Sequence, residues 1–114
     1  SDLSDFFNRD YGIEIFLHLL YRNFKSERQI RFYADKLNVS SAYLSRMVKE
    51  ISGTTVNDHI TSLLYKEICN LLKQSDMTMG EIADYLHFND QSALTNFFKT
   101  RAGMTPLAYR NQCN

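Results

Sequence analysis

The hydrophobic residues of this chain recur at helical spacing over most of its length. Between residues 41 and 52 they fall at i, i+3, i+4 and i+7, the pattern of one buried helix face. The same periodicity covers residues 13–24 and the longer stretch 56–72. The positions are Ile13, Phe16, Leu17, Leu20 and Phe24 in the first stretch, Leu44, Met47, Val48 and Ile51 in the second, and Val56, Ile60, Leu63, Leu64, Ile68, Leu71 and Leu72 in the third. The pattern predicts an all-α fold.

Two parts of the chain resemble each other. Residues 33–55 match residues 82–105, at an offset of 49 positions that becomes 50 after a central turn. In each copy a short helical pattern precedes the turn and a second one follows it, with Ala34 and Leu37 before the first turn and Ile82, Ala83 and Leu86 before the second. We expect a duplicated helix-turn-helix motif.

Polar and glycine residues mark the ends of the predicted helices. A short polar side chain stands where each second helix should begin, and a glycine stands where it should end. A Thr-Pro pair near the C-terminus is typical of a helix start, because proline is well tolerated at the first helical position. These residues are Ser40 or Ser41, Asn89 or Asp90, Gly53, Gly103, Thr105 and Pro106.

The repeat predicts a division into two lobes. We expect an N-terminal helix-turn-helix lobe over residues 1–55, a linker helix over 56–74 and a C-terminal lobe over 75–114, with about seven homeodomain-like helices in all. A linker helix of this length spans roughly 25–30 Å, which approaches the ~34 Å turn of B-DNA. We expect the three parts together to form one DNA-binding domain and to be a fragment of a longer regulator.

Charge is segregated along the sequence although the net charge is zero. Residues 28–49 carry five basic residues against one acidic residue, and residues 50–89 carry two against six. Such a run is usually a solvated helix face, so it supports nucleic-acid binding only together with the repeat. No stretch is apolar enough for a membrane span, and we expect no membrane partner. Two distant cysteines predict reduced thiols in the cytoplasm, and no metal, cofactor or catalytic group is expected.

Motifs in both copies resemble those of the AraC/XylS family of bacterial transcription regulators, in its C-terminal DNA-binding domain. The resemblance covers residues 11–110. It rests on Ala34-Asp35-x-Leu37-x-Val39-Ser40, Tyr43-Leu44-Ser45-Arg46, Ile82-Ala83, Phe88-x-Asp90-Gln91-Ser92, Phe98-Lys99, Gly103-Met104-Thr105-Pro106 and Tyr109-Arg110. It implies two lobes joined by a long helix, with one recognition helix in each of two successive major grooves of double-stranded DNA. A sensory or receiver domain is expected in the full-length chain, and RNA polymerase is a further candidate partner.

The chain departs from the family pattern at a few positions. His87 stands where the second turn usually has glycine, so it must either adopt a positive φ or reshape the turn. Ser62 and Leu64 stand where the linker helix commonly has arginines. Asn96 replaces an arginine of the second recognition helix, which predicts a weaker grip on DNA or a different base preference.

Helix geometry and the resemblance together predict which residues touch DNA. Arg46 is the best candidate for reading a base, because its guanidinium can bond guanine O6 and N7 together; the alternative is a surface ion pair with Glu50. Predicted base contacts are Ala42, Ser45 and Arg46 in the first lobe, and Gln91, Ser92, Thr95 and Asn96 in the second. In the alternative for the second lobe, Asp90 and Ser92 only cap the helix and Gln91 is solvated. Predicted phosphate contacts are Arg28, Arg31, Tyr43, Lys49, Lys99 and Arg101.

Two other functions compete with DNA binding by a regulator. DNA-repair alkyltransferases carry a similar helical domain, with a cysteine as methyl acceptor, but Cys69 and Cys113 have no activating base nearby in the sequence. We therefore expect the chain not to be an enzyme. The near-neutral surface and the missing arginines are also compatible with a protein-interaction module.

Overall fold

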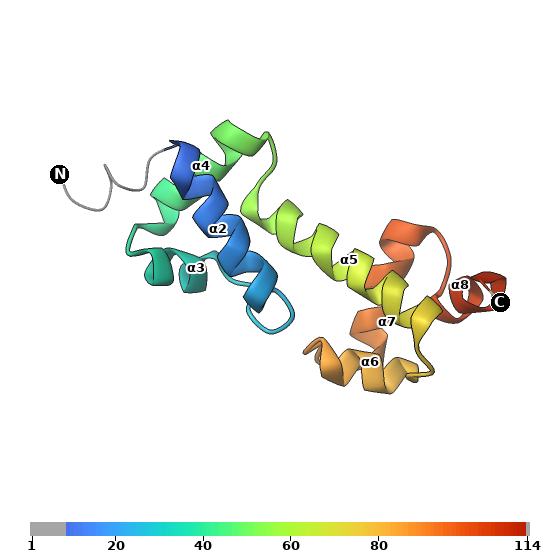
Figure 1. Ribbon diagram of the computed structural model, residues 1–114. Coiled ribbons are helices and arrows are strands. Elements are labelled where there is room, and N and C mark those ends of the chain that lie inside the picture. Colours follow the sequence, from blue (N-terminus) through green and yellow to red (C-terminus); the bar gives the residue numbers. More distant parts are fainter. Residues whose placement is uncertain (1–8, 114) are drawn as a thin grey trace. The chain divides into compact units, whose positions relative to one another are not determined.

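Helices account for most of the chain that the computed structural model describes, residues 9–113 (Figure 1). Their bounds are α2 Arg9–Asn23, α3 Ile30–Leu37, α4 Ser41–Ser52, α5 Val56–Gln74, α6 Met79–Tyr85, α7 Gln91–Ala102 and α8 Pro106–Cys113. No strand occurs in these residues, and the predicted all-α class is confirmed. Residues 1–8 of the predicted N-terminal lobe and residue 114 lie outside the described part.

The chain divides into two compact units. One runs to Thr61 and the other begins at Ser62, so the boundary falls inside α5. The first unit holds α2, α3, α4 and the start of α5, and the second holds the rest of α5 with α6, α7 and α8. Each unit therefore contains one helix-turn-helix pair.

The first unit is built on the apolar faces that the sequence pattern marks. Phe16 and Leu20 of α2 and Leu44 and Val48 of α4 are fully buried, together with Tyr33 of α3. The Tyr33 hydroxyl donates a hydrogen bond of 2.6 Å to the Glu27 carbonyl, which satisfies its polar end. Burying a large apolar side chain of this kind stabilises a fold by about 1.5–3 kcal/mol. This core fixes α4 against α2 and α3.

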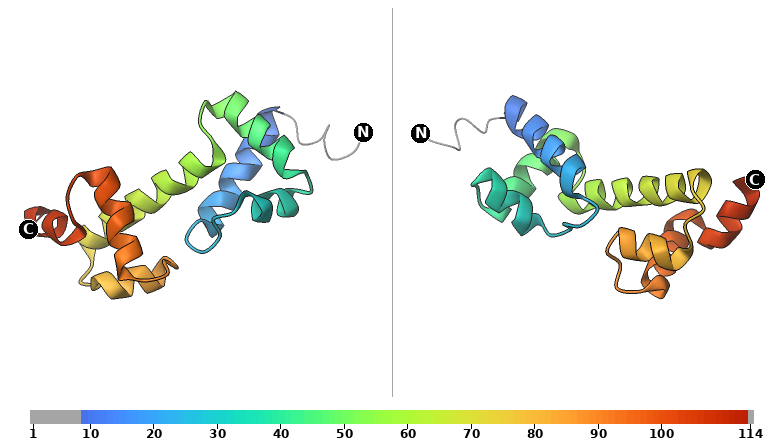
Figure 2. Two further views of the ribbon diagram at one scale, coloured as in Figure 1. Left: turned by 180° about the vertical axis from the view of Figure 1, so that it is seen from behind. Right: turned by 60° about the horizontal axis from the view of Figure 1, so that its bottom comes forward.

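The second unit packs α6, α7 and α8 around the C-terminal part of α5 (Figure 2). Phe98 of α7 is fully buried, stacks on Tyr65 of α5 at a centroid distance of 5.3 Å, and meets Tyr109 of α8 edge-on at 5.4 Å. The other buried apolar side chains are Leu64, Ile68, Leu72, Ile82, Ala83, Leu86, Leu94 and Pro106. The aromatic trio thus joins α5, α7 and α8.

Both helix-turn-helix turns use a residue with positive φ. Asn38 has φ 60° and His87 has φ 59°. After each of them a backbone N–H returns to the preceding helix, from Val39 to the Ala34 carbonyl at 3.0 Å and from Phe88 to the Ala83 carbonyl at 2.8 Å. Of the two outcomes that the sequence left open for His87, the residue adopts the left-handed conformation and the turn keeps its shape.

Replacing His87 with glycine should stabilise the protein. Positive φ costs a non-glycine residue about 1–2 kcal/mol of folding free energy, and glycine removes this strain. Glycine is also more flexible in the unfolded chain, which offsets about 0.5–1 kcal/mol of that gain. We expect His87→Gly to raise the free energy of unfolding by roughly 0.5–1 kcal/mol in urea titrations followed by circular dichroism. Asn38→Gly is the matched control with a smaller gain, because asparagine tolerates this conformation better. A loss of stability in His87→Gly would show that the imidazole makes a contact worth more than the strain.

The predicted helix ends are confirmed. Ser40 and Asp90 cap α4 and α7 through their side-chain oxygens, and Gly53 and Gly103 end those helices with φ 82° and 76°. Thr105 accepts from the Ala108 N–H at 3.1 Å, so Pro106 is the first residue of α8. One cap escaped the sequence analysis: α6 begins with a capping box formed by Thr78 and Glu81. Its Thr-x-x-Glu spacing is a recognisable signature of a helix start.

Candidate DNA interface

The exposed face of α4 carries the predicted base contacts of the first unit. Leu44, Met47 and Val48 are buried on the opposite face, so Ala42, Ser45 and Arg46 point to solvent. The helix starts at the Ser40 hydroxyl, which accepts from the Tyr43 N–H at 3.0 Å. The cap therefore fixes where the exposed side chains begin.

Arg46 and Tyr43 form a pair on α4. The Arg46 guanidinium lies 5.8 Å from the centroid of the half-buried Tyr43 ring, which is within the range of a cation–π contact. Such a contact restrains a long, flexible side chain and reduces the entropy that it loses on binding. Arg46 is thus exposed and partly oriented.

Lys49 has a role within its own helix. Its Nζ donates a 3.1 Å hydrogen bond to the carbonyl of Gly53, next to the C-terminus of α4. A cation at this end also interacts favourably with the helix dipole. Lys49 is exposed, so a phosphate contact by this ammonium group would require it to leave that carbonyl or to be shared with it.

Arg28 lies at a cavity rather than on an open surface. It precedes α3 and lines a hollow of about 270 Å³ together with Ser45 of α4 and Thr55 and Asn57 at the start of α5. Partial burial lowers the pKa of Arg28 from its usual value, and the nearby Tyr33 partly opposes that shift. The structure thus brings Arg28 and Ser45 to one cavity, whereas Arg31 is exposed on α3 and does not line it.

Three of the predicted contacts on α7 share one exposed helix face, and two others lie beside it or at the helix start. Ser92, Asn96 and Lys99 are exposed and recur at i, i+4 and i+7, so they share one helix face. Thr95 is half-buried beside them, and Gln91 is exposed at the first position of the helix.

Arg101 is exposed but does not lie on the face of α7 that carries Ser92, Asn96 and Lys99. Its guanidinium lies over the Phe97 ring at 4.3 Å from the centroid. Two residues of helix separate it from Lys99, a rotation of about 200°. A phosphate contact by Arg101 would therefore come from another side of α7 than the Lys99 contact.

Two further groups hold the frame of the candidate interface, and the sequence analysis did not assign them this role. His59 Nε2 lies 3.0 Å from the Ser52 hydroxyl and 2.9 Å from the Thr54 hydroxyl, joining the end of α4 to the start of α5. Arg110 of α8 donates from Nε to the Leu72 carbonyl at 3.0 Å and from Nη2 to those of Leu71 and Ser75 at 3.3 and 3.2 Å. The resemblance includes Arg110, but its targets lie 35 to 39 positions away in the sequence.

Cys69, one of the two cysteines considered as a methyl acceptor, is part of a packing contact. A hydrogen bond with the Cys69 thiol raises the pKa of Tyr109 to about 12, and burial adds to that shift. Cys69 is half-buried in α5 and also interacts with Tyr65. Within residues 9–113 no group of three or more His, Cys, Asp or Glu residues is placed to hold a metal ion. In that same part of the chain none of the helices has the length and apolar character needed to cross a bilayer.

Comparison with known proteins identifies the family. A family model described as a helix-turn-helix domain matches residues 33–112, which is most of the chain and includes both motifs. The chain belongs to the AraC-type helix-turn-helix family of DNA-binding transcription regulators. The resemblance seen in the sequence is thereby confirmed. Because proteins of this family regulate transcription, the AraC-type domain is not an enzyme, as expected.

Individual relatives of the AraC-type domain are longer than this chain. It is 27% identical over 96 residues to the HTH-type transcriptional regulator YtdP of Bacillus subtilis, covering 84% of this chain and 12% of that protein. It is 23% identical over 94 residues to the Msm operon regulatory protein of Streptococcus mutans, covering 82% and 34%. The chain thus spans about an eighth to a third of these two proteins.

Solved structures share the fold of the AraC-type domain. The C-terminal domain of the two-component response regulator YesN of Fusobacterium nucleatum is 25% identical with a TM-score of 0.83, over 89% of this chain and 99% of that one. The C-terminal domain of AraT, a response regulator from Geobacillus stearothermophilus, is 27% identical with a TM-score of 0.82, over 88% and 84%. The DNA-binding domain of AdpA, in complex with a target DNA, matches at 19% identity and a TM-score of 0.78 over 87% and 89%, a likeness of fold alone.

Proposed function

We propose that this AraC-type domain recognises a specific double-stranded DNA sequence by inserting α4 and α7 into successive major grooves. The observation that carries the proposal is the repeated arrangement of these two helices. Each is capped by a polar side chain, buries one face through Leu44 or Leu94, and exposes polar residues on the other. A helix presented in this way has the dimensions of the major groove.

The proposed base contacts differ between the two helices. On α4 Arg46 reads guanine and Ala42 meets a thymine methyl group, and on α7 Gln91 and Asn96 suit the donor and acceptor pair of adenine. Ser92 and Thr95 complete the second set, with Thr95 limited by its partial burial. The first unit supplies the stronger discrimination in this proposal, because a bidentate arginine is the commonest specific contact.

The proposed phosphate contacts position the domain without reading sequence. Arg28 is the anchor in the first unit: an anion entering its cavity would meet the guanidinium, the Ser45 hydroxyl and the start of α5, where backbone N–H groups favour negative charge. Ser45 then contributes to a phosphate contact as well as to base reading. The other proposed phosphate contacts are Arg31, Tyr43, Lys49, Lys99 and Arg101.

We further propose that the domain acts in the cytoplasm as part of a longer regulator that carries a sensory or receiver domain and contacts RNA polymerase. Two of the three similar structures named above are C-terminal domains of response regulators, which supports a receiver domain. The chain matches only 12% and 34% of the length of the two relatives, which supports its being part of a larger protein.

Selection of bound duplexes from a random pool, followed by affinity measurements over a range of salt concentrations, tests the proposed function. We expect one enriched site, and an affinity that falls with salt at a logarithmic slope of about −0.9 for each phosphate contact engaged. If roughly four of the six candidate residues engage, the slope is about −4. If no site is enriched and the affinity for duplex DNA at low salt does not exceed the background of the assay, DNA recognition is contradicted and a protein-interaction module is favoured.

A further inference from the structure

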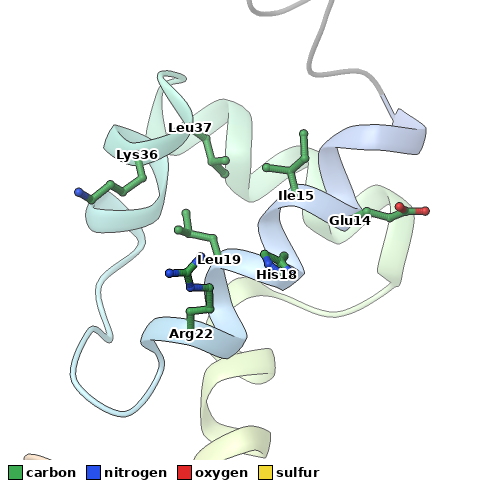
Figure 3. Close-up of a pocket in the computed structure, with 7 residues that line it drawn as sticks. All are labelled: Glu14, Ile15, His18, Leu19, Arg22, Lys36 and Leu37. Atoms are coloured by element: carbon green, nitrogen blue, oxygen red, sulfur yellow. The ribbon is translucent and has the colours of Figure 1, made fainter.

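The first unit carries an apolar groove whose lining includes no candidate DNA contact. It lies between α2 and α3, has a volume of about 520 Å³, and is floored by Ile15, Leu19 and Leu37. Figure 3 shows Ile15 and Leu37 directed toward one another across it, with Leu19 beside them.

Charges of opposite sign stand at the two ends of this α2–α3 groove. Glu14 lies at one end, and Arg22 and Lys36 lie at the other (Figure 3). Glu14, His18 and Arg22 are spaced at i, i+4 and i+8 on α2, so they form a single row along the helix surface. The row carries a negative charge at its start and a positive charge at its end.

The solvent-facing side of α2 is unusually apolar for a helix that already supplies a core. Phe16 and Leu20 are fully buried on its inner face, yet Tyr11, Ile15 and Tyr21 remain 63%, 37% and 64% exposed. Scattered exposed apolar residues are normal, but Ile15 is itself part of the apolar floor of the groove. An apolar surface rimmed by charges is typical of an interaction site.

We propose that the α2–α3 groove binds α2 of a second copy of this chain, in antiparallel orientation, so that the domain forms a symmetric dimer. A two-fold axis near His18 places Glu14 against Arg22 of the partner subunit, and Arg22 against the partner subunit's Glu14. Packing of i±4 rows against each other at a crossing angle of about −50° is the commonest way for helices to meet. The row formed by Glu14, His18 and Arg22 is such a row, and its reversal matches unlike charges at both ends.

A second copy accounts for more of this surface than an unrelated acidic partner does. An acidic peptide would complement Arg22 and Lys36 but would leave Glu14 facing a like charge. In the symmetric arrangement Glu14 of the partner subunit meets both cations, while Ile15 and Leu19 are covered by an equally apolar face. The same patch then serves both subunits, as a two-fold interface requires.

Sedimentation velocity of the 114-residue chain, from micromolar to millimolar concentration and without DNA, tests the dimer. The wild-type protein should shift from monomer to dimer as concentration rises. Glu14→Arg and Arg22→Glu should each weaken dimerisation about tenfold or more, because each places like charges together twice per dimer. The double variant Glu14→Arg/Arg22→Glu should regain most of the loss, since the pairs are restored with their signs exchanged.

The control and the contradicting results separate this inference from the proposed function. Lys66→Glu reverses an exposed charge on α5 outside the groove and should leave dimerisation unchanged. The dimer would be overturned if the wild-type protein stays monomeric at millimolar concentration. It would also be overturned if the double variant dimerises no more tightly than the weaker of the two single variants. Both results are read without DNA, so neither depends on whether the chain recognises a duplex.

Discussion

Arg110→Met should lower the free energy of unfolding by about 2–3 kcal/mol. A hydrogen bond from a charged donor contributes about 1.5–3 kcal/mol, and the three bonds of Arg110 do not add fully because one side chain makes them all. The guanidinium of Arg110 reaches the carbonyls of Leu71, Leu72 and Ser75, at and just beyond the end of α5. The variant removes all three of these hydrogen bonds, although the Leu71 carbonyl keeps those from the Ser75 N–H and hydroxyl at 3.1 and 2.7 Å. The cation also opposes the negative end of the α5 dipole.

Urea unfolding followed by circular dichroism measures this effect, with Arg31→Met as the matched control. Arg31 is exposed on α3, so the same change there should alter stability by at most about 0.5 kcal/mol. Arg110→Lys should recover part of the loss, because an ammonium keeps the charge but not the planar fork. If Arg110→Met were as stable as Arg31→Met, the carbonyl contacts would contribute nothing measurable.

Most of the fold could be predicted because its signals are local. Ser40, Asp90, Gly53 and Gly103 act within one turn of their own position, so residue type locates the ends of α4 and α7 at the glycines themselves and to within one residue at the caps. The apolar periodicity of α5 likewise depends only on neighbours three and four residues away. His87 could be flagged as exceptional, but whether it adopts positive φ depends on the balance between strain and the packing around the turn.

The candidate DNA interface could be predicted less completely. Periodicity identifies the exposed face of α4, which carries Ala42, Ser45, Arg46 and Lys49, and the family resemblance selects the first three of these as base contacts. It does not tell what a long cationic side chain contacts. Lys49 bonds a carbonyl four residues away, Arg28 lines a cavity built from three segments, and Arg101 lies over an aromatic ring. These placements depend on tertiary packing, so residue type and spacing alone cannot distinguish them.

Arg46→Ala should reduce affinity for the selected duplex by about 1–3 kcal/mol, or roughly 5- to 150-fold, and relax base preference at one position. Arg46 is exposed on the face of α4 opposite the core, and its contact with Tyr43 restrains the guanidinium before DNA arrives. The loss should be larger on the selected site than on random duplexes, since hydrogen bonds to guanine are made only where guanine is present. Competition binding at fixed salt, on the selected site and on single-base variants of it, measures both quantities.

Lys99→Ala gives the contrasting result that makes the Arg46 assignment testable. A residue that contacts only phosphate should weaken every duplex by a similar factor and reduce the salt slope by about one. Arg46→Ala and Lys99→Ala each remove one positive charge from the exposed side of a recognition helix, so a purely electrostatic role for both would give the same pattern. Equal losses on selected and random DNA in Arg46→Ala would show that this guanidinium contacts phosphate, and base reading on α4 would then fall to Ala42 and Ser45. A selective loss in Arg46→Ala beside a uniform loss in Lys99→Ala would instead separate specificity from positioning at the level of single side chains.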